Sequence, residues 1–375
     1  MTATIPDPAT PVELNVSVQV NPAPADLIRK IMKVSSGNTN LTNGHYAAVT
    51  ASDYTTIFTS PTATNETLLW LKAFFDQAPD KTAYVLEATA QHDLDTFITA
   101  GTAPMYTYFV PAAWYESGPY YTGDFVSLVK SKTAVPAATY FAVEVTHGVS
   151  PAEDQNFLAY AKSKSLFPIY GNAVADESVP GAIAGVMASG LYDLSQANPA
   201  TMLNYKRLNG ITPETLDASL RNDLNNNGCN YASDFSGNTV LFNGRYADLN
   251  AWDYWYNFDW LQINLLNSVS AAIVNGSNVP AAAIRYNQNG IDALKSVCNG
   301  VCSLGMTDGT VTNFGAGYNS QTGLITNPGT FNAIEFNSYI AANPADYEAG
   351  IYKGLSAYIQ IGRYIRQVVL NVTVN

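Results

Sequence analysis

The sequence is short of charge. Only 13% of its 375 residues are charged, whereas about 25% is usual. Lys and Arg number 18 against 30 Asp and Glu, which gives a net charge of −12. Proteins that bind nucleic acid need a basic footprint, so this balance argues against a nucleic-acid partner. The polar surface must consist of Asn, Thr, Ser and the 24 Tyr, a composition close to that of protein interfaces.

Long apolar runs and a disulfide framework are also lacking. No run approaches the ~18–20 apolar residues that span a bilayer, which predicts no membrane insertion. Residues 1–20 contain no basic residue and no continuous apolar stretch, so we expect no signal peptide. Three cysteines, Cys229, Cys298 and Cys302, are too few for a disulfide-built scaffold. Cys298 and Cys302 would share one face of a helix. The three His are scattered in the sequence, which argues against a metal site, so we interpret the cysteines as buried thiols.

Catalytic motifs are missing as well. The sequence has no P-loop and no G-x-S-x-G nucleophile elbow, and its nearest glycine-rich stretch, 315–320, lacks the third glycine. The acids Asp253 and Asp259 could be fitted to a glycosidase scheme, but such pairs are common. The aromatic cluster 252–260 is either a sugar-binding platform or a core or subunit contact, and the second interpretation is favoured. We predict no enzymatic activity, no cofactor and no metal.

Helix and strand patterns alternate from about residue 42 to residue 192. A helix begins at Asn65 and ends before Pro79, and another runs from Pro180 to Met187. Short apolar strands lie between helical segments, at 83–86, 105–110, 139–145 and 166–170. Strands that alternate with helices at this spacing predict a parallel sheet wrapped by helices.

The second half of the chain lacks this regular alternation of strands and helices. A helix is expected from Thr212 to Asn227, because Thr-Pro-Glu is a helix-start pattern and Asn-Gly a helix-end pattern. A long helix follows from Trp252 to Val274. The remaining predicted elements are a strand at 239–242, a helix at 290–301 and a hairpin or loop at 305–331.

Both ends of the chain carry an alternating apolar segment without a local partner. Prolines bracket the first segment, so its partner strand must be distant or on another chain. The apolar residues of the two predicted strands are Val12, Leu14, Val16, Val18 and Val20 at the N-terminus, and Val368, Val369, Leu370, Val372 and Val374 at the C-terminus.

Several segments, taken in order, resemble the sheath proteins of contractile phage tails. They are Ala73–Pro79 with the strand after it, Ala182–Ala188, Lys206–Ile211, Asn230–Ala232 with Asn243–Gly244, Phe258–Leu261 and the terminal strand after Gly362. The resemblance covers most of the chain.

The resemblance implies a structural protein of the virion. Subunits of this family stack helically around a tail tube and contract to drive the tube through the host envelope for genome delivery. It implies four parts: an N-terminal arm at 1–26, a parallel-sheet α/β domain at 27–204, a mixed α+β assembly domain at 205–365 and a C-terminal arm at 366–375. The arms would be exchanged between subunits by strand addition. The implied partners are other copies of the chain, the tail tube protein, and baseplate and tail terminator proteins, with assembly in the host cytoplasm.

A local charge inversion marks the end of the chain. After Glu348 there is no acid, but there are three bases, Lys353, Arg363 and Arg366. We interpret them as tube-facing residues that would meet an acidic tube surface; the alternative is cations drawn to a helix C-terminus. Two other functions remain open, namely a surface-layer or shell protein and a carbohydrate-active enzyme.

Overall fold

The chain folds into two compact units. The computed structural model describes residues 31–101, 105–111, 114, 125, 127–129, 139–146, 165–171, 177–190, 202–278 and 283–366. The α/β unit comprises the described residues up to Trp255 together with 364–366, and the hairpin unit comprises those from Tyr256 to Arg363. Residues 1–26 and 367–375 of the predicted arms lie outside the described residues.

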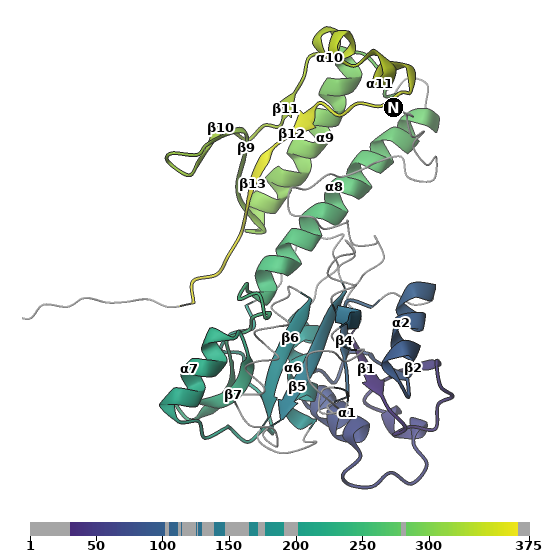
Figure 1. Ribbon diagram of the computed structural model, residues 1–375, viewed down its shortest axis with the longest axis vertical. Coiled ribbons are helices and arrows are strands. Elements are labelled where there is room, and N and C mark those ends of the chain that lie inside the picture. The colour runs from purple at the N-terminus through teal and green to yellow at the C-terminus, as the bar shows by residue number, and fades with distance from the viewer. Residues whose placement is uncertain are drawn as a thin grey trace, which may run out of the picture. The chain divides into compact units, whose positions relative to one another are not determined.

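An eight-stranded sheet forms the α/β unit, with the order β2-β3-β1-β4-β5-β6-β7-β8 (Figure 1). The six inner strands are mutually parallel, and β2 and β8 pair antiparallel at the two edges. The predicted parallel sheet is therefore confirmed. The elements are β1 (Ile31–Ser35), β2 (Tyr46–Val49), η1 (Tyr54–Ile57), α1 (Glu66–Gln77), β3 (Ala83–Glu87), α2 (Gln91–Ala100), β4 (Thr107–Phe109), β5 (Tyr140–Thr146), β6 (Leu166–Gly171), α6 (Ser178–Gly190), α7 (Ala218–Asn226), β7 (Asn230–Phe235) and β8 (Asn238–Phe242).

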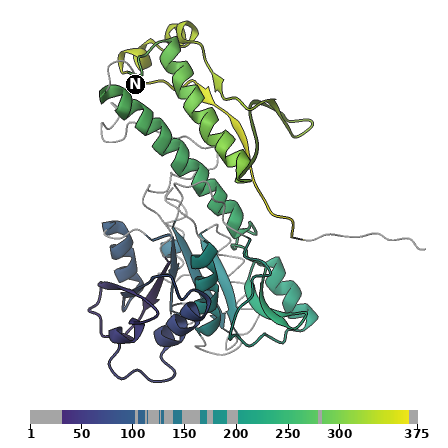
Figure 2. The ribbon, with the colours of Figure 1, turned by 180° about the vertical axis from the view of Figure 1, so that it is seen from behind.

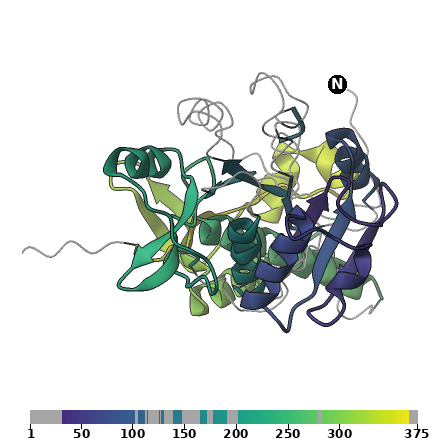
Figure 3. The same cartoon turned by 90° about the horizontal axis from the view of Figure 1, so that it is seen from below.

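Helices cover both faces of this sheet. Met32 and Val34 of β1 share a buried cluster with Leu94 and Phe97 of α2. Because successive side chains of a strand point to opposite faces, Lys33 lies on the other face, where α1 and α6 run side by side (Figure 3). A strand that is buried on both sides is apolar almost throughout, which is why β5 and β6 can be recognised from sequence.

The close packing of α1 against α6 depends on glycine. A Cβ atom at Gly181 would lie 2.3 Å from the carbonyl oxygen of Trp70, and one at Gly185 would lie 2.5 Å from that of Phe74. The α1 helix begins where predicted, because the Asn65 side chain accepts a hydrogen bond from the Leu68 N–H at 2.9 Å. Backbone contact between the two helices fixes this layer of the core.

The boundary between the units falls at residue 255 rather than at the predicted 204. The reason is that β7 pairs parallel with β6, which makes residues 205–255 a continuation of the α/β unit. The helix expected from Thr212 begins instead at Ala218, and the Asp217 side chain accepts from the Leu220 N–H at 2.8 Å. Residues before it run along the sheet, since the Glu214 N–H donates to the carbonyl oxygen of Ala232 at 2.9 Å.

The hairpin unit contains a three-stranded antiparallel sheet packed against α9 (Figure 2). Strand β9 is central, β10 and β13 flank it, and the β9–β10 hairpin projects beyond the helix (Figure 2). The α8 helix begins in the α/β unit and continues into this one. The remaining elements are α8 (Trp252–Asn278), α9 (Gln288–Thr307), β9 (Val311–Asn319), β10 (Leu324–Pro328), β11 (Asn332–Ala333), α10 (Phe336–Ala342), α11 (Pro344–Glu348), β12 (Leu355–Ser356) and β13 (Tyr358–Ile361).

Candidate assembly surfaces

The sheet of the hairpin unit has two open edges. Within the described part of the chain, β10 and β13 each pair with β9 on one side and with no strand on the other. Neither strand contains a Lys or Arg, although proteins commonly place charge on an edge strand to prevent association. Leu324, at the start of β10, is 64% exposed. These edges can accept a strand from another chain.

An exposed tyrosine pair lies on the same sheet. Tyr318 of β9 and Tyr358 of β13 stack with ring centroids 5.3 Å apart, and about half of each side chain is exposed. Tyrosines are enriched at protein interfaces because they offer a large apolar area at a low entropic cost. The pair makes this sheet a candidate contact surface.

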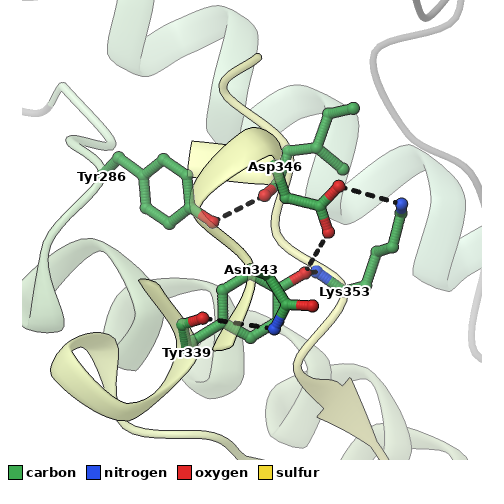
Figure 4. Close-up of polar contacts among 6 residues, drawn as sticks. Tyr286, Tyr339, Asn343, Asp346 and Lys353 are labelled. Carbon is green, nitrogen blue, oxygen red and sulfur yellow. Dashed lines mark hydrogen bonds and ion pairs between the residues drawn. The ribbon is translucent and has the colours of Figure 1, made fainter. Parts of the chain in front are cut away.

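A tyrosine-rich cap lies between β10 and β13 in the sequence, at residues 332–354 (Figure 4). The Tyr339 hydroxyl donates to Asp346 Oδ2 at 2.8 Å and accepts from the Lys353 N–H at 2.9 Å. Lys353 Nζ lies 3.2 Å from Asp346 Oδ1. Tyr286, which precedes α9, donates its hydroxyl to the carbonyl oxygen of Ile351 at 2.5 Å. One carboxylate thus ties α10, α11 and the following loop together.

The charge state of the cap follows from these contacts. Hydrogen bonds from Tyr339 and then from Lys353 hold the pKa of Asp346 below its ordinary value. Burial raises the pKa of Tyr286 and Tyr352 to about 12. Near neutral pH the carboxyl is ionised and the phenols are neutral, which is the state in which the network is complete.

The three predicted tube-facing bases occupy different settings. Lys353 pairs with Asp346 but keeps a side chain that is 62% exposed, and Arg363 is exposed at the end of the hairpin unit. Arg366 belongs to the α/β unit and forms an ion pair with Asp253, whose side chain is fully buried. Two of the three bases therefore present charge at the surface of the hairpin unit.

The aromatic cluster at 252–260 is part of the core. Trp252, Trp255 and Trp260 are at most 6% exposed, so the structural interpretation is confirmed and a solvent-facing sugar platform is excluded. Asp253 and Asp259 are both fully buried. Neither acid lies at a surface where a glycan could reach it.

The cysteines are buried, as predicted. Burial raises the pKa of Cys298 to about 11 and that of Cys302 to about 12, which leaves both as unreactive thiols. Cys229 is also buried. Among the described residues no group of three His, Cys, Asp or Glu side chains is placed to hold a metal, and no helix there is long and apolar enough to cross a membrane.

A buried glutamate lies at the carboxyl end of β3, the side on which parallel sheets often bind ligands. Such ligands lie at the carboxyl ends of the strands. Here Glu87 ends β3, is 3% exposed, and accepts hydrogen bonds from the loop after β1: from the Gly37 N–H at 2.5 Å and from the Thr39 hydroxyl at 2.6 Å. The loop amides are thereby taken by the protein's own carboxylate, an arrangement that sequence patterns did not reveal.

No protein-family model and no curated protein matches the sequence. The structure is similar to the helical sheath of the anti-feeding prophage in its contracted state, with a TM-score of 0.59, 14% identity, and coverage of 97% of this chain and 98% of that chain. The chain has the fold of a tail sheath protein. Sheath tail proteins from Listeria innocua (TM-score 0.48, 10% identity, 76% and 86% covered) and Desulfitobacterium hafniense (TM-score 0.48, 9% identity, 83% and 92% covered) are also similar.

Proposed function

We propose that this protein is the structural subunit of a contractile phage tail sheath. It polymerises helically around a tail tube and contracts to drive the tube through the host envelope. The observation that carries this proposal is the likeness over 97% of the chain to a subunit of a helical sheath. The uncharged edges and exposed tyrosines of the hairpin unit support it, because a protein that assembles needs such surfaces.

The terminal arms would join the subunits. The open edges of β10 and β13 are acceptors for strands from neighbouring copies, whose main-chain hydrogen bonds supply affinity while alternating side chains fix the register. The proposed donor residues are Val12, Leu14, Val16, Val18 and Val20 of one arm and Val368, Val369, Leu370, Val372 and Val374 of the other. The hairpin unit thus serves as the core of the assembly domain.

Lys353 and Arg363 are the bases proposed to face the tube. Both are exposed on the hairpin unit, and complementary charge on the tube would set the register more than the affinity. Reversing both charges should reduce co-sedimentation with tubes at low salt and leave the subunit folded. Baseplate and tail terminator proteins would close the two ends of the polymer.

Electron microscopy of the purified protein tests the proposal. A sheath subunit gives hollow, striated tubes, and the tube protein fills their lumen when it is added during assembly. Flat lattices would support a surface-layer protein instead. Protein that stays monomeric at all concentrations, both alone and with preformed tubes, would contradict the proposal.

A further inference from the structure

The chain leaves the hairpin unit through a slot that only glycine fits. Gly362, directly after β13, is buried, and its N–H donates to the carbonyl oxygen of Thr310 at 2.7 Å. Its own carbonyl oxygen accepts from Asn257 Nδ2 of α8 at 3.3 Å. A Cβ atom at this position would lie 1.8 Å from the carbonyl oxygen of Gly309. The backbone is therefore held on both polar groups and enclosed by its neighbours.

Arg366 holds the chain a second time, four residues later. One arm of its guanidinium reaches Asp253 Oδ1 of α8 at 2.9 Å, and the other donates to the carbonyl oxygen of Asn243. Asp253 is fully buried and the Arg366 side chain is only 17% exposed. A buried carboxylate needs a paired cation, and the planar guanidinium fork satisfies two acceptors at once. Opening this contact would take the guanidinium away from a buried carboxylate.

The two fixed points lie directly before the predicted C-terminal strand. Asp253 and Asn257 are one turn apart on α8, and their partners Arg366 and Gly362 have the same spacing along the chain. Between the fixed points the side chains face solvent, and Ile365 is 79% exposed. Contacts within the subunit therefore account for the hold on the backbone, and the exposed side chain of Ile365 is available for contact with another chain.

We infer that Gly362 and Arg366 anchor the C-terminal arm, and that a second copy of the chain docks beside this anchor. The inference rests on the proposed function. The predicted C-terminal strand begins at Val368, only two residues after Arg366, and a chain spans at most about 7 Å over two residues. The neighbour's sheet edge must then lie next to residues 243–254, where Leu249 is 44% exposed, close in sequence to Asn243 and Asp253. Arg366 acts as an anchor rather than as a tube-facing base.

Because residues 362–366 are fixed to their own subunit, a strand shared with a neighbour could transmit force between the two subunits. Load on the arm reaches α8 through the ion pair and through the contacts of Gly362, both built from groups with little solvent access. Without the anchor, a load on the arm would detach the segment from Gly362 onward from its own subunit before it moved the neighbouring subunit. Arg366 is accordingly a positioning residue for assembly.

Hydrogen exchange of the isolated full-length subunit tests the anchor. We expect Gly362→Ala and Arg366→Gln to raise the exchange of residues 358–366 at least tenfold. Arg285→Gln, which removes an exposed base elsewhere on the hairpin unit, should leave the exchange of these residues unchanged. Because Arg366→Gln removes the cation that faces the buried Asp253 carboxylate, the double variant Asp253→Asn/Arg366→Gln serves as a second test in which this carboxylate is also neutral. Unchanged exchange in the double variant and in Gly362→Ala would overturn the anchor.

Sedimentation of assembled protein tests its role. The anchor variants should need at least tenfold more protein to polymerise than Arg285→Gln does. Ile365→Asp should weaken assembly while its exchange pattern stays that of the wild type. If the wild type assembles and the anchor variants assemble equally well despite faster exchange, the inference fails and the proposed sheath function stands. If the wild type never assembles, the proposed function fails, and with it the docking of a second copy, while the exchange result still decides the anchor.

Discussion

The β8 edge of the α/β sheet is covered by its own chain, whereas the two edge strands of the hairpin-unit sheet pair with β9 alone among the described residues. In the α/β unit, β8 is flanked by residues 205–208, where the Tyr205 N–H donates to the carbonyl oxygen of Leu241 and the Leu208 N–H to that of Thr239. Helices bury both faces of that sheet. In the hairpin unit, among the described residues, the sheet has three strands, one packed helix and two uncovered edges.

This difference suggests that folding stability and association between chains depend on different parts of the molecule. Buried apolar area is the main source of folding free energy, and the α/β unit holds most of the fully buried large side chains, among them Trp70, Trp252 and Phe74. Unpaired backbone groups are instead a source of association between chains. We therefore expect changes in the α/β unit to alter unfolding and changes at the edges and arms to alter assembly.

Removing an arm should give the largest effect on assembly. It therefore tests most directly whether stability and assembly depend on different parts of the molecule. We expect deletion of residues 1–20 or of residues 367–375 to abolish polymerisation and to leave a soluble subunit with a cooperative unfolding transition. The reason is that the arms would belong to a neighbour's sheet, so the parent subunit loses little of its own core. Sedimentation and thermal unfolding measure the two properties. A truncated subunit that unfolds, or one that still forms tubes, would break the proposed division.

The buried ion pair of the α/β unit should give the next largest effect. Lys33 Nζ lies 2.5 Å from Glu177 Oε1, and both side chains are 1% exposed. Lys33→Met leaves a buried carboxylate, which should lower the free energy of unfolding by about 3–5 kcal/mol. The double variant Lys33→Met/Glu177→Met removes both charges and should recover most of this loss. Denaturant unfolding measures both variants.

Lys81→Met provides the matched control. Lys81 pairs with Asp80 at 3.1 Å, but the two side chains are 39% and 72% exposed. Exposed pairs contribute little, so no measurable change in stability is expected. Equal effects of Lys33→Met and Lys81→Met would show that burial does not govern these pairs.

Much of the α/β unit could be predicted from sequence, because its signals are local. The capping residue Asn65 and the apolar runs of β5 and β6 act within a few positions. By contrast, β7 carries no apolar pattern; the Asn230 side chain holds it by donating to the carbonyl oxygens of Pro168 and Arg245, each at 2.8 Å. Such contacts join distant segments, and no local pattern reports them.

The same limit applies to the candidate assembly residues. The Gly, Asn and Thr content of residues 305–331 predicted a hairpin or loop, and the structure shows a hairpin of β9 and β10, although α9 extends to Thr307. The setting of Arg366 could not be predicted, because its partner Asp253 is 113 positions away in sequence. Nor could the helix start at Thr212 be rejected locally, since the competing partner of Glu214 is the carbonyl oxygen of Ala232 in β7.

Alanine substitutions at two glycines should change the free energy of unfolding in opposite directions. Gly181→Ala places a Cβ atom 2.3 Å from the Trp70 carbonyl oxygen, so α1 and α6 must move apart at a cost of about 1–3 kcal/mol. Gly300→Ala, in α9 of the hairpin unit, meets nothing within 4 Å and should stabilise by about 0.5–1 kcal/mol through helix propensity. Denaturant unfolding of the two variants measures the contrast. Destabilisation by both would mean that α9 is packed as tightly as α6.

The smallest effect concerns pH and the tyrosine-rich cap. The pKa of Asp346 is lowered by Tyr339 and Lys353, so its ionised form favours the folded cap. This contribution is fully present above the ordinary pKa of 3.8 and is lost as the pH falls through the lower pKa of the folded state. Hydrogen exchange of residues 332–354, corrected for intrinsic rates, should therefore be constant from pH 7 to about pH 5 and rise in stronger acid.

Asp346→Asn isolates the effect, and Asp53→Asn is its control in the other unit. Asp346→Asn should exchange faster in the cap at pH 6 and show no further acid dependence there. The pKa of Asp53 is also lowered, by hydrogen bonds from the Thr50 backbone and side chain, so Asp53→Asn should affect only its own turn. If Asp346→Asn matches the wild type at pH 6, the carboxylate does not hold the cap. If Asp53→Asn loosens the cap as much, the two units do not respond separately to local changes.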